Sequence, residues 1–156
     1  MNEKAMLLAI EKARETMNSN IGGPFGAAII SESGAILAVS SNSVLRDHDA
    51  TAHAEVNAIR EAGKMMKTHD LTGYVLYTTC YPCPMCLSAV IWANIKVIYY
   101  ACTSKDAENI GFRDDFIYDV INNFDGSTDI IKLYPVDKQD AIKLFEEYSK
   151  KNKTIY

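Results

Sequence analysis

The five residues Pro82-Cys83-Pro84-Met85-Cys86 constrain this chain more than any other stretch of its sequence. The two prolines favour the start of a helix, because the first helical turn leaves its N–H groups unpaired in any case. Two cysteines at this spacing lie on one face of that turn, and the partial positive charge of a helix N-terminus favours the thiolate, which is the form that binds metals. A Cys-x-x-Cys pair also occurs in redox centres and structural zinc sites. We therefore expect paired metal-binding or redox thiols at the start of a helix.

A second motif upstream, Thr51-Ala52-His53-Ala54-Glu55, narrows these choices. A His-x-Glu followed by Pro-Cys-x-x-Cys is the signature of zinc-dependent nucleobase deaminases. One imidazole and two thiolates give zinc three protein ligands and leave a fourth position open for water, as catalytic sites require. The hydrolysis also needs a carboxylate beside the metal that moves protons without binding the metal. We therefore predict a zinc ion bound by His53, Cys83 and Cys86, with Glu55 as the catalytic proton shuttle.

Less specific explanations exist for both motifs. A closed structural zinc site would need a fourth ligand, for which the sequence offers Cys80, Cys102, His48 and His69. Of these candidates, Cys80 and Cys102 lie near expected strand ends, where small buried apolar side chains are common. A zinc-stabilised binding module without catalysis would have no use for a base such as Glu55 beside an open metal. The combination of the two motifs therefore favours an enzyme.

Length and composition are those of an ordinary globular protein. The 156 residues suggest a single domain, and the net charge of −4, with acidic and basic residues interspersed, disfavours a nucleic-acid partner. Four cysteines, two of them placed as metal ligands, fit a reducing compartment better than a disulfide framework. The sequence shows no signal-peptide pattern and no apolar run of about 20 residues. We therefore expect a cytoplasmic protein that does not span a membrane.

Hydrophobic periodicity predicts an α/β fold in which helices alternate with strands. Apolar residues at helical spacing predict helices over 3–18, 53–64, the residues after Cys86, about 116–124, and from 137 onward. Short apolar runs predict five strands, at 26–30, 35–40, 74–78, 95–101 and 130–134, the first two of which form a hairpin. This order of elements predicts a three-layer sandwich, in which helices cover both faces of a mixed five-stranded sheet and the last three strands run parallel.

Two polar positions have simple local explanations. Asn42 follows the second expected strand, and spacing alone favours a turn residue there. Asp114 and Asp115 precede an expected helix, where aspartate commonly caps the first turn. From the residues alone, turn formation and capping are sufficient reasons for these side chains.

Several segments, spread over most of the chain, carry a resemblance to a known family. They are Gly22–Ala27, Thr51–Val56, Ala58–Arg60, Leu76–Thr78, Pro82–Leu87 and Gly111–Tyr118. On these residues the chain resembles the cytidine deaminase-like superfamily, and within it the small zinc-dependent guanine deaminases of bacteria. The zinc motif is common to the whole superfamily. The segment around Asp114 and the aromatic C-terminus discriminate better, because tRNA adenosine deaminases lack them.

The resemblance implies hydrolytic deamination of guanine to xanthine and ammonia. One alternative activity is the deamination of a related aminated heterocycle (guanosine, cytosine or an amino-triazine). A second alternative is a tRNA adenosine deaminase, which the acidic charge balance disfavours. It also implies that Asn42 hydrogen-bonds the purine and that Asp114 accepts hydrogen bonds from the amino and imino N–H groups of the purine. The backbone of Ala54 is expected to touch the ring, and Phe25 to pack nearby.

In this family the C-terminal segment crosses to a partner subunit. The resemblance therefore implies a homodimer that exchanges residues from about 137 to 156, with Tyr156 closing the neighbour's pocket. Two positions depart from the relatives. Tyr81 stands where a glutamate usually precedes the metal motif, which puts any role of that glutamate in doubt and leaves room for another aminopurine or an amino-triazine as the preferred substrate. Ala50 stands where proline usually precedes Thr51, a change that affects only the rigidity of the loop.

Overall fold

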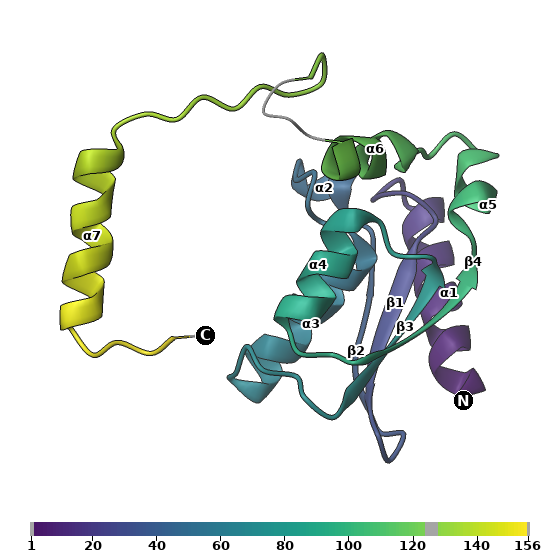
Figure 1. Ribbon diagram of the computed structural model, residues 1–156. Coiled ribbons are helices and arrows are strands. Elements are labelled where there is room, and N and C mark those ends of the chain that lie inside the picture. Colours follow the sequence, from purple (N-terminus) through teal and green to yellow (C-terminus); the bar gives the residue numbers. More distant parts are fainter. Residues whose placement is uncertain (1, 124–127, 156) are drawn as a thin grey trace. The chain divides into compact units, whose positions relative to one another are not determined.

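The computed structural model describes residues 2–123 and 128–155 (Figure 1). The chain divides into two compact units, residues 1–118 and 119–156. The first unit contains a β-sheet and the helices around it. The second unit contains α7 (Lys138–Lys150), which matches the last predicted helix.

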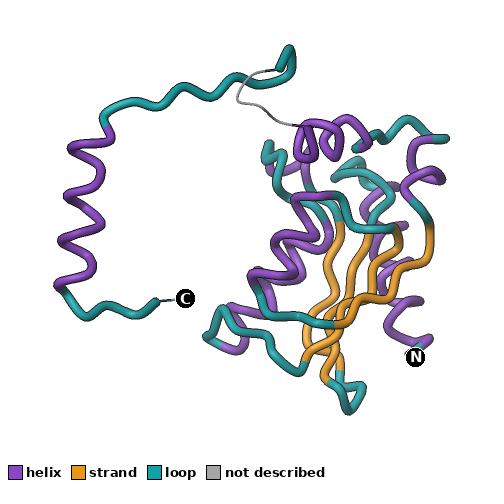
Figure 2. The backbone as a smooth tube through the Cα atoms, viewed as in Figure 1, coloured by secondary structure: helices purple, strands orange, loops and turns teal. Residues whose placement is uncertain are grey.

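A four-stranded sheet with the order β2-β1-β3-β4 forms the centre of the first unit (Figure 2). The first strand, β1 (Gly26–Ser31), runs antiparallel to both β2 (Ile36–Ser41) and β3 (Tyr74–Cys80), whereas β3 runs parallel to β4 (Val97–Cys102). A parallel pair needs a crossover connection, which α4 (Pro84–Trp92) supplies between β3 and β4. The predicted hairpin and the parallel pairing of the third and fourth strands are thereby confirmed.

Alternate residues of β1 point to opposite faces of the sheet and enter two separate apolar cores. On one face, Ala28 and Ile30 pack with the alanines of α1 (Glu3–Asn18) and with Tyr77. On the other face, Ala27 and Ile29 pack with residues of α3 (Ala54–Met66) and α4, among them Ala54, Ala58, Ala62 and Val90. The prediction of an α/β fold with helices on both faces of a mixed sheet is therefore confirmed.

Small residues allow α1 to approach the sheet closely. The buried positions of the helix are Ala5, Ala9, Ala13 and Thr16. A Cβ atom on Gly26 would lie only 2.0 Å from the backbone oxygen of Ala9, so a larger residue at this position would push the helix away from β1. The contact fixes the start of β1, and this strand follows the Gly22-Gly23 loop that contributes to the site described below.

The predicted fifth strand at residues 130–134 does not form. The described sheet has four strands, and the apolar side chains of the segment are 47–79% exposed (Ile130, Ile131, Leu133 and Tyr134). A strand is stable only beside a neighbour whose backbone takes up its hydrogen bonds, and an apolar run in the sequence does not reveal whether such a neighbour exists. The prediction of a five-stranded sheet is therefore wrong.

Three further helices lie between these elements. Periodicity indicated α6 (Asp115–Asn123) but not α2 (Val44–Asp47) or α5 (Ser104–Glu108), because four or five residues are too few to show a helical repeat. A capping box between Thr103 and Asp106 marks the start of α5 and was the available sequence signal. No helix in the described ranges has the length and apolar character needed to cross a membrane.

Candidate active site

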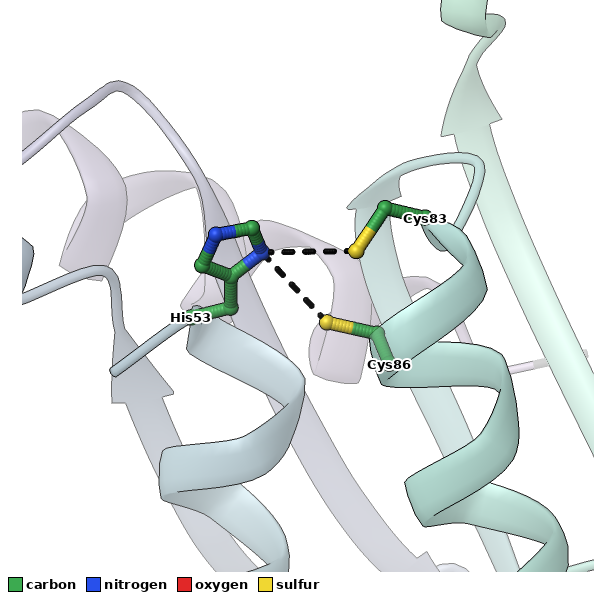
Figure 3. A group of neighbouring side chains, drawn as sticks. All are labelled: His53, Cys83 and Cys86. Atoms are coloured by element: carbon green, nitrogen blue, oxygen red, sulfur yellow. Dashed lines mark hydrogen bonds between the residues drawn. The ribbon is translucent and has the colours of Figure 1, made fainter. Parts of the chain in front are cut away.

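The three predicted metal ligands come from the N-termini of two neighbouring helices (Figure 3). His53 is the N-cap residue of α3, and Cys83 is the N-cap residue of α4, with Pro84 at the first helical position and Cys86 in the first turn. Both N-cap residues have extended backbone conformations, and neither uses its side chain to cap its helix. The imidazole and the thiols therefore remain available to a ligand that lies beyond the helix ends.

The geometry of these three side chains fits zinc. The Nδ1 atom of His53 lies 3.5 Å from the sulfur of Cys83 and 3.5 Å from that of Cys86. Zn–N bonds of about 2.0 Å and Zn–S bonds of about 2.3 Å at tetrahedral angles place nitrogen and sulfur about 3.5 Å apart. Over residues 2–123 and 128–155, no other His, Cys, Asp or Glu has a ligand atom within 4.8 Å of all three of these atoms, so a closed four-ligand structural site is disfavoured.

The two thiols differ in their readiness to lose a proton. A hydrogen bond from the Cys86 thiol, assisted by His53, lowers the pKa of Cys83 to about 4. The same contact, together with burial, raises the pKa of Cys86, which therefore holds the proton of the pair. The hydrogen bond to Cys83 raises the pKa of His53. A divalent cation displaces the protons of thiols and imidazolium when it binds. The three side chains are therefore suited to hold a metal, and their affinity for it depends on pH.

Glu55 lies beside the ligand group and is almost completely buried, with 6% of its surface exposed. One carboxylate oxygen accepts a hydrogen bond from the Thr78 hydroxyl at 3.0 Å, and the other lies 3.4 Å from the Cys86 sulfur. Burial is the main cause that raises the pKa of Glu55. A carboxyl group with a raised pKa next to a metal site is suited to take up a proton and to give it back.

His53, Glu55 and Cys83 border a cavity of about 630 Å³ in the first unit. Its walls are mostly apolar, and a few polar groups converge on it, which is the usual character of a small-molecule site. The residues that line it are Gly22, Gly23, Phe25, Asn42, Val44, Leu45, Ala50, His53, Glu55, Cys80, Tyr81, Cys83, Met85, Ser104, Ala107, Phe112, Arg113, Asp114 and Ile117. The volume is sufficient for a free base or a nucleoside.

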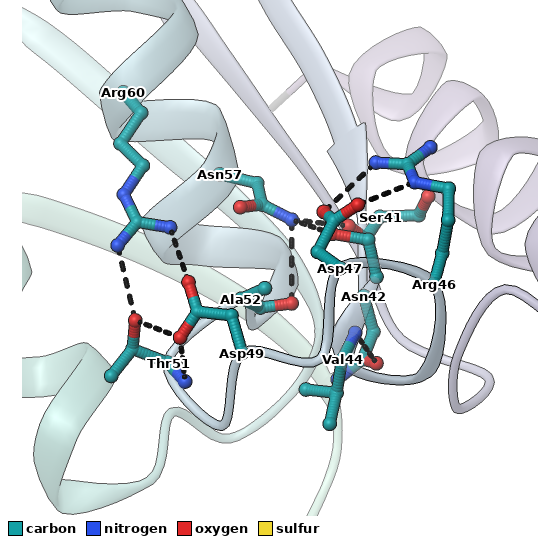
Figure 4. Close-up of polar contacts among 11 residues, drawn as sticks. Ser41, Asn42, Val44, Arg46, Asp47, Asp49, Thr51, Ala52, Asn57 and Arg60 are labelled. Atoms are coloured by element: carbon teal, nitrogen blue, oxygen red, sulfur yellow. Dashed lines mark hydrogen bonds and ion pairs between the residues drawn. The ribbon is translucent and has the colours of Figure 1, made fainter.

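Asn42 lies in the cavity wall and is 6% exposed. Its side-chain oxygen accepts hydrogen bonds from the backbone N–H groups of Gly23 and Val44, each at 3.2 Å. Figure 4 shows the contact with Val44. The hydrogen bonds of this oxygen are therefore used by the backbone around the turn that follows β2. The amide N–H₂ group of Asn42 is left to donate to a ligand. The turn role and a binding role are compatible at this position.

Asp114 also lies in the cavity wall, directly before α6. Partial burial, followed by the negative charge of Cys83, raises the pKa of Asp114. Phe25 packs edge-to-face against Phe112, with ring centroids 4.9 Å apart. Ala54 is completely buried at the start of α3. Tyr156, which the resemblance places over a partner's pocket, lies outside the described residues.

The loop between Asn42 and His53 is held by a network of polar contacts (Figure 4). The side-chain amide of Asn57 donates to the backbone oxygens of Ser41 at 2.9 Å and Ala52 at 3.3 Å. It therefore links the end of β2 to the residue that precedes His53. By linking Ser41 to Ala52, the Asn57 side chain holds together the segments that carry Asn42 and His53, both of which line the cavity.

Other residues of the cavity wall had no clear sequence signal. They include Val44 and Leu45 in the short helix α2, Met85 between the two metal-site cysteines, and Phe112, Arg113 and Ile117 around Asp114. Tyr81 also lines the cavity, and its ring lies edge-to-face against Tyr100 at a centroid distance of 5.1 Å. The proximity of Tyr81 to the zinc motif in the sequence was the one hint of its position.

Comparison with known proteins gives consistent matches. The family model for the cytidine and deoxycytidylate deaminase zinc-binding region matches residues 1–102. The chain is similar to a guanine deaminase of Bacillus subtilis (strain 168), with 48% identity over 78% of this chain and 78% of the relative. It is also similar to a tRNA-specific adenosine deaminase of Aquifex aeolicus, with 33% identity over 82% of this chain and 81% of the relative.

Solved structures give the same picture. The crystal structure of guanine deaminase from Bacillus subtilis has a TM-score of 0.93 and 42% identity, covering 100% of this chain and 99% of that chain. A guanine deaminase from Nitrosomonas europaea has a TM-score of 0.69 and 34% identity, covering 73% of this chain and 65% of that chain. The first of these similarities extends over the whole chain and therefore includes the residues that line the cavity.

Proposed function

Because the chain belongs to the cytidine and deoxycytidylate deaminase family of zinc-binding proteins, we propose that it catalyses the zinc-dependent hydrolysis of guanine to xanthine and ammonia. One observation carries this proposal: the cavity lined by Glu55 and by two members of the ligand group, His53 and Cys83, is also lined by two polar side chains suited to a purine, Asn42 and Asp114. The similarity to guanine deaminases of two bacteria supports the choice of base.

The catalytic groups divide the chemistry between them. His53, Cys83 and Cys86 hold the zinc ion, which when bound supplies a Lewis acid that activates water at neutral pH. Glu55 takes one proton from the attacking water and delivers it to the ring nitrogen, where it stays in the product. It then takes the second proton of that water from the hydroxyl formed on the carbon and delivers it to the amino group, which leaves as ammonia. The hydrogen bond from Thr78 at 3.0 Å fixes the orientation of the carboxylate without consuming both of its oxygens. The raised pKa of Glu55 makes the return of the proton easier.

Asp114 and Asn42 recognise the base in this proposal. Guanine presents two adjacent donors, N1–H and the exocyclic N2–H₂ group, and one carboxylate accepts from both. Hydrogen bonds to a charged acceptor are about twice as strong as those between neutral groups. Adenine has an acceptor at N1, which the Asp114 carboxylate would repel. Asn42 contributes a donor, since its oxygen is occupied by backbone N–H groups, and therefore suits an acceptor atom of the purine.

The test of this function is ammonia release from guanine, guanosine, cytosine, adenine and the amino-triazine ammeline. It is measured with the wild type and with Asp114→Asn. We expect guanine to be the preferred substrate of the wild type. In the variant, kcat/KM for guanine should drop by at least about tenfold, and the ratio of guanine to adenine turnover should fall with it. An unchanged ratio, with a small loss of stability, would mean that Asp114 only caps α6.

The same panel tests a second substrate class, which Tyr81 favours. Tyr81 lines the cavity next to the zinc motif and is 39% exposed, so its ring is available to a ligand. An aromatic wall stacks on any flat aminated heterocycle, whether purine or triazine. Faster turnover of ammeline than of guanine would move the proposal to an amino-triazine deaminase with the same metal site and the same proton shuttle.

We further propose that the protein is a homodimer in which residues from about 137 to 156 contact the partner subunit, with the whole chain forming a single deaminase domain. Each unit by itself exposes a large apolar surface. In the first unit these residues include Ile91, Trp92, Val97 and Tyr100, and in the second unit they include Ile142, Leu144, Phe145 and Tyr148 on α7. Exposed apolar side chains in such numbers are expected where a surface is covered by a partner. The four free cysteines support a reducing, cytoplasmic setting.

A charge on the apolar side of α7 should separate the dimer. Phe145 is 68% exposed, so Phe145→Glu should cost an isolated chain little, whereas in an interface it buries an unpaired charge. We expect light scattering to show a dimer for the wild type and a monomer for Phe145→Glu. Gln139→Glu adds the same charge to the polar side of this helix and should leave the dimer intact. Equal masses for all three proteins would contradict the proposal.

A further inference from the structure

The phenol of Tyr118 makes a contact that the chemistry above does not use. Its hydroxyl donates a hydrogen bond to the backbone oxygen of Pro82 at 3.1 Å. Pro82 directly precedes Cys83, so the accepting oxygen belongs to the loop that presents the first thiol of the metal site. Partial burial is the main cause that raises the pKa of Tyr118 to about 12, and the phenol therefore keeps its proton and remains a donor.

Tyr118 also belongs to the same helical turn as Asp114. Side chains four residues apart lie on one side of a helix, and the backbone oxygen of Asp114 already accepts from the N–H of Ile117 at 3.0 Å. The hydrogen bond from Tyr118 to Pro82 therefore connects the turn that carries Asp114 to the loop that carries Cys83. Both partners lie within the first unit.

Few other polar contacts hold this turn in place. Of the hydrogen bonds described for residues 109–118, the bond from Tyr118 alone reaches the loop that carries Cys83. The ion pair between Arg113 and Asp115 lies within the turn, and its two side chains are 59% and 57% exposed. An exposed pair of this kind contributes little and fixes nothing outside its own segment. Phe112, two residues before Asp114, packs on Phe25, and this apolar contact does not reach the loop that carries Cys83.

We propose that Tyr118 is a positioning residue that sets the distance between Asp114 and the metal ligands. The inference rests on the proposed function, in which Asp114 accepts hydrogen bonds from the N1–H and N2–H₂ groups of guanine. The carbon that bears this amino group must at the same time face Glu55 and the metal. Reacting atoms need to approach to within about 3–3.5 Å, and a small displacement of the gripping group moves the reacting carbon away from that range. A tether between the two groups is therefore a direct determinant of rate.

The test is Tyr118→Phe, which removes one oxygen atom and keeps the ring. We expect kcat/KM for guanine to fall about tenfold, mainly through kcat, while zinc content and melting temperature stay close to those of the wild type. Tyr77→Phe is the matched control, because its hydroxyl accepts from the backbone N–H of Asn2 at 2.7 Å, in the core beneath α1. We expect this control to change kcat/KM by less than about twofold.

A double-mutant cycle with Asp114→Asn shows whether Tyr118 acts through Asp114. Once the grip of Asp114 on the base is lost, Tyr118→Phe should add less than about a twofold further loss. The same factor in both backgrounds, or a Tyr118→Phe enzyme as fast as the wild type, would overturn the inference. A wild type that does not deaminate guanine would instead reject the proposed function. The cycle would then be measured on the panel compound that is turned over, with the same two outcomes deciding.

Discussion

Glu55→Gln should lower kcat for guanine by at least about 10²-fold and leave the zinc content near that of the wild type. The substitution keeps the shape of the side chain and the hydrogen bond from Thr78, which needs only an acceptor oxygen. It removes the basic oxygen that takes the proton from water and the acid that protonates the leaving group. Because Glu55 is not one of the three metal ligands, zinc should remain bound.

The matched control for this variant is Glu61→Gln on the same helix. Glu61 accepts a hydrogen bond from Ser40 at 2.7 Å and does not line the cavity, so its neutralisation should change kcat by less than about twofold. Steady-state ammonia release and elemental analysis of all three proteins decide the matter. A Glu55→Gln enzyme that keeps most of its activity would show that another group moves the proton.

The centre of the site was predictable from the sequence because its geometry is local. His53 and Cys83 are N-cap residues, and Cys86 lies one turn further along, so helix starts and spacing place each motif on its helix, and the joint signature indicates that the two motifs share one metal. The burial of Glu55 against β3 is not local, but its position two residues after His53 keeps it next to the metal site. The metal chemistry could therefore be derived before the fold was known.

The walls of the cavity were not predictable in this way. Asn42 and Asp114 had adequate local explanations as turn and capping residues, and only the resemblance pointed to a role in binding. Val44 and Phe112 line the cavity because the tertiary structure brings α2 and the segment before α6 next to it, and no periodicity in the sequence indicates that arrangement. Selectivity for one base therefore depends on tertiary structure, whereas the metal site depends on motifs.

The error at residues 130–134 has the same origin. The apolar run at Ile130 and Ile131 has the composition of a strand, and strand propensity reflects a half-buried, paired environment rather than an intrinsic preference of the backbone. In the described structure, these side chains are 59% and 47% exposed, without a sheet neighbour. The four strands that did form each have a partner that is also predicted from the sequence, either across a hairpin or by a helical crossover.

Loss of the metal should have the largest effect of all. Cys86→Ala removes one of three ligands, and we expect zinc to fall from about one ion per chain to almost none. Activity should fall by at least about 10³-fold, because the metal contributes several kcal/mol to the stabilisation of the transition state. Chelation of the wild type should produce the same loss, and added zinc should restore the chelated wild type but not the variant.

Cys102→Ala is the matched control for this experiment. Cys102 is exposed at the end of β4 and lies outside the ligand group, so the variant should keep both zinc and activity. This control distinguishes the effect of losing a metal ligand from the effect of losing a thiol elsewhere in the chain. Full zinc occupancy in Cys86→Ala, or a fourth protein ligand in a zinc-loaded crystal structure, would contradict a three-ligand site. With a fourth protein ligand, the ion would be structural, and the hydrolysis would need another origin.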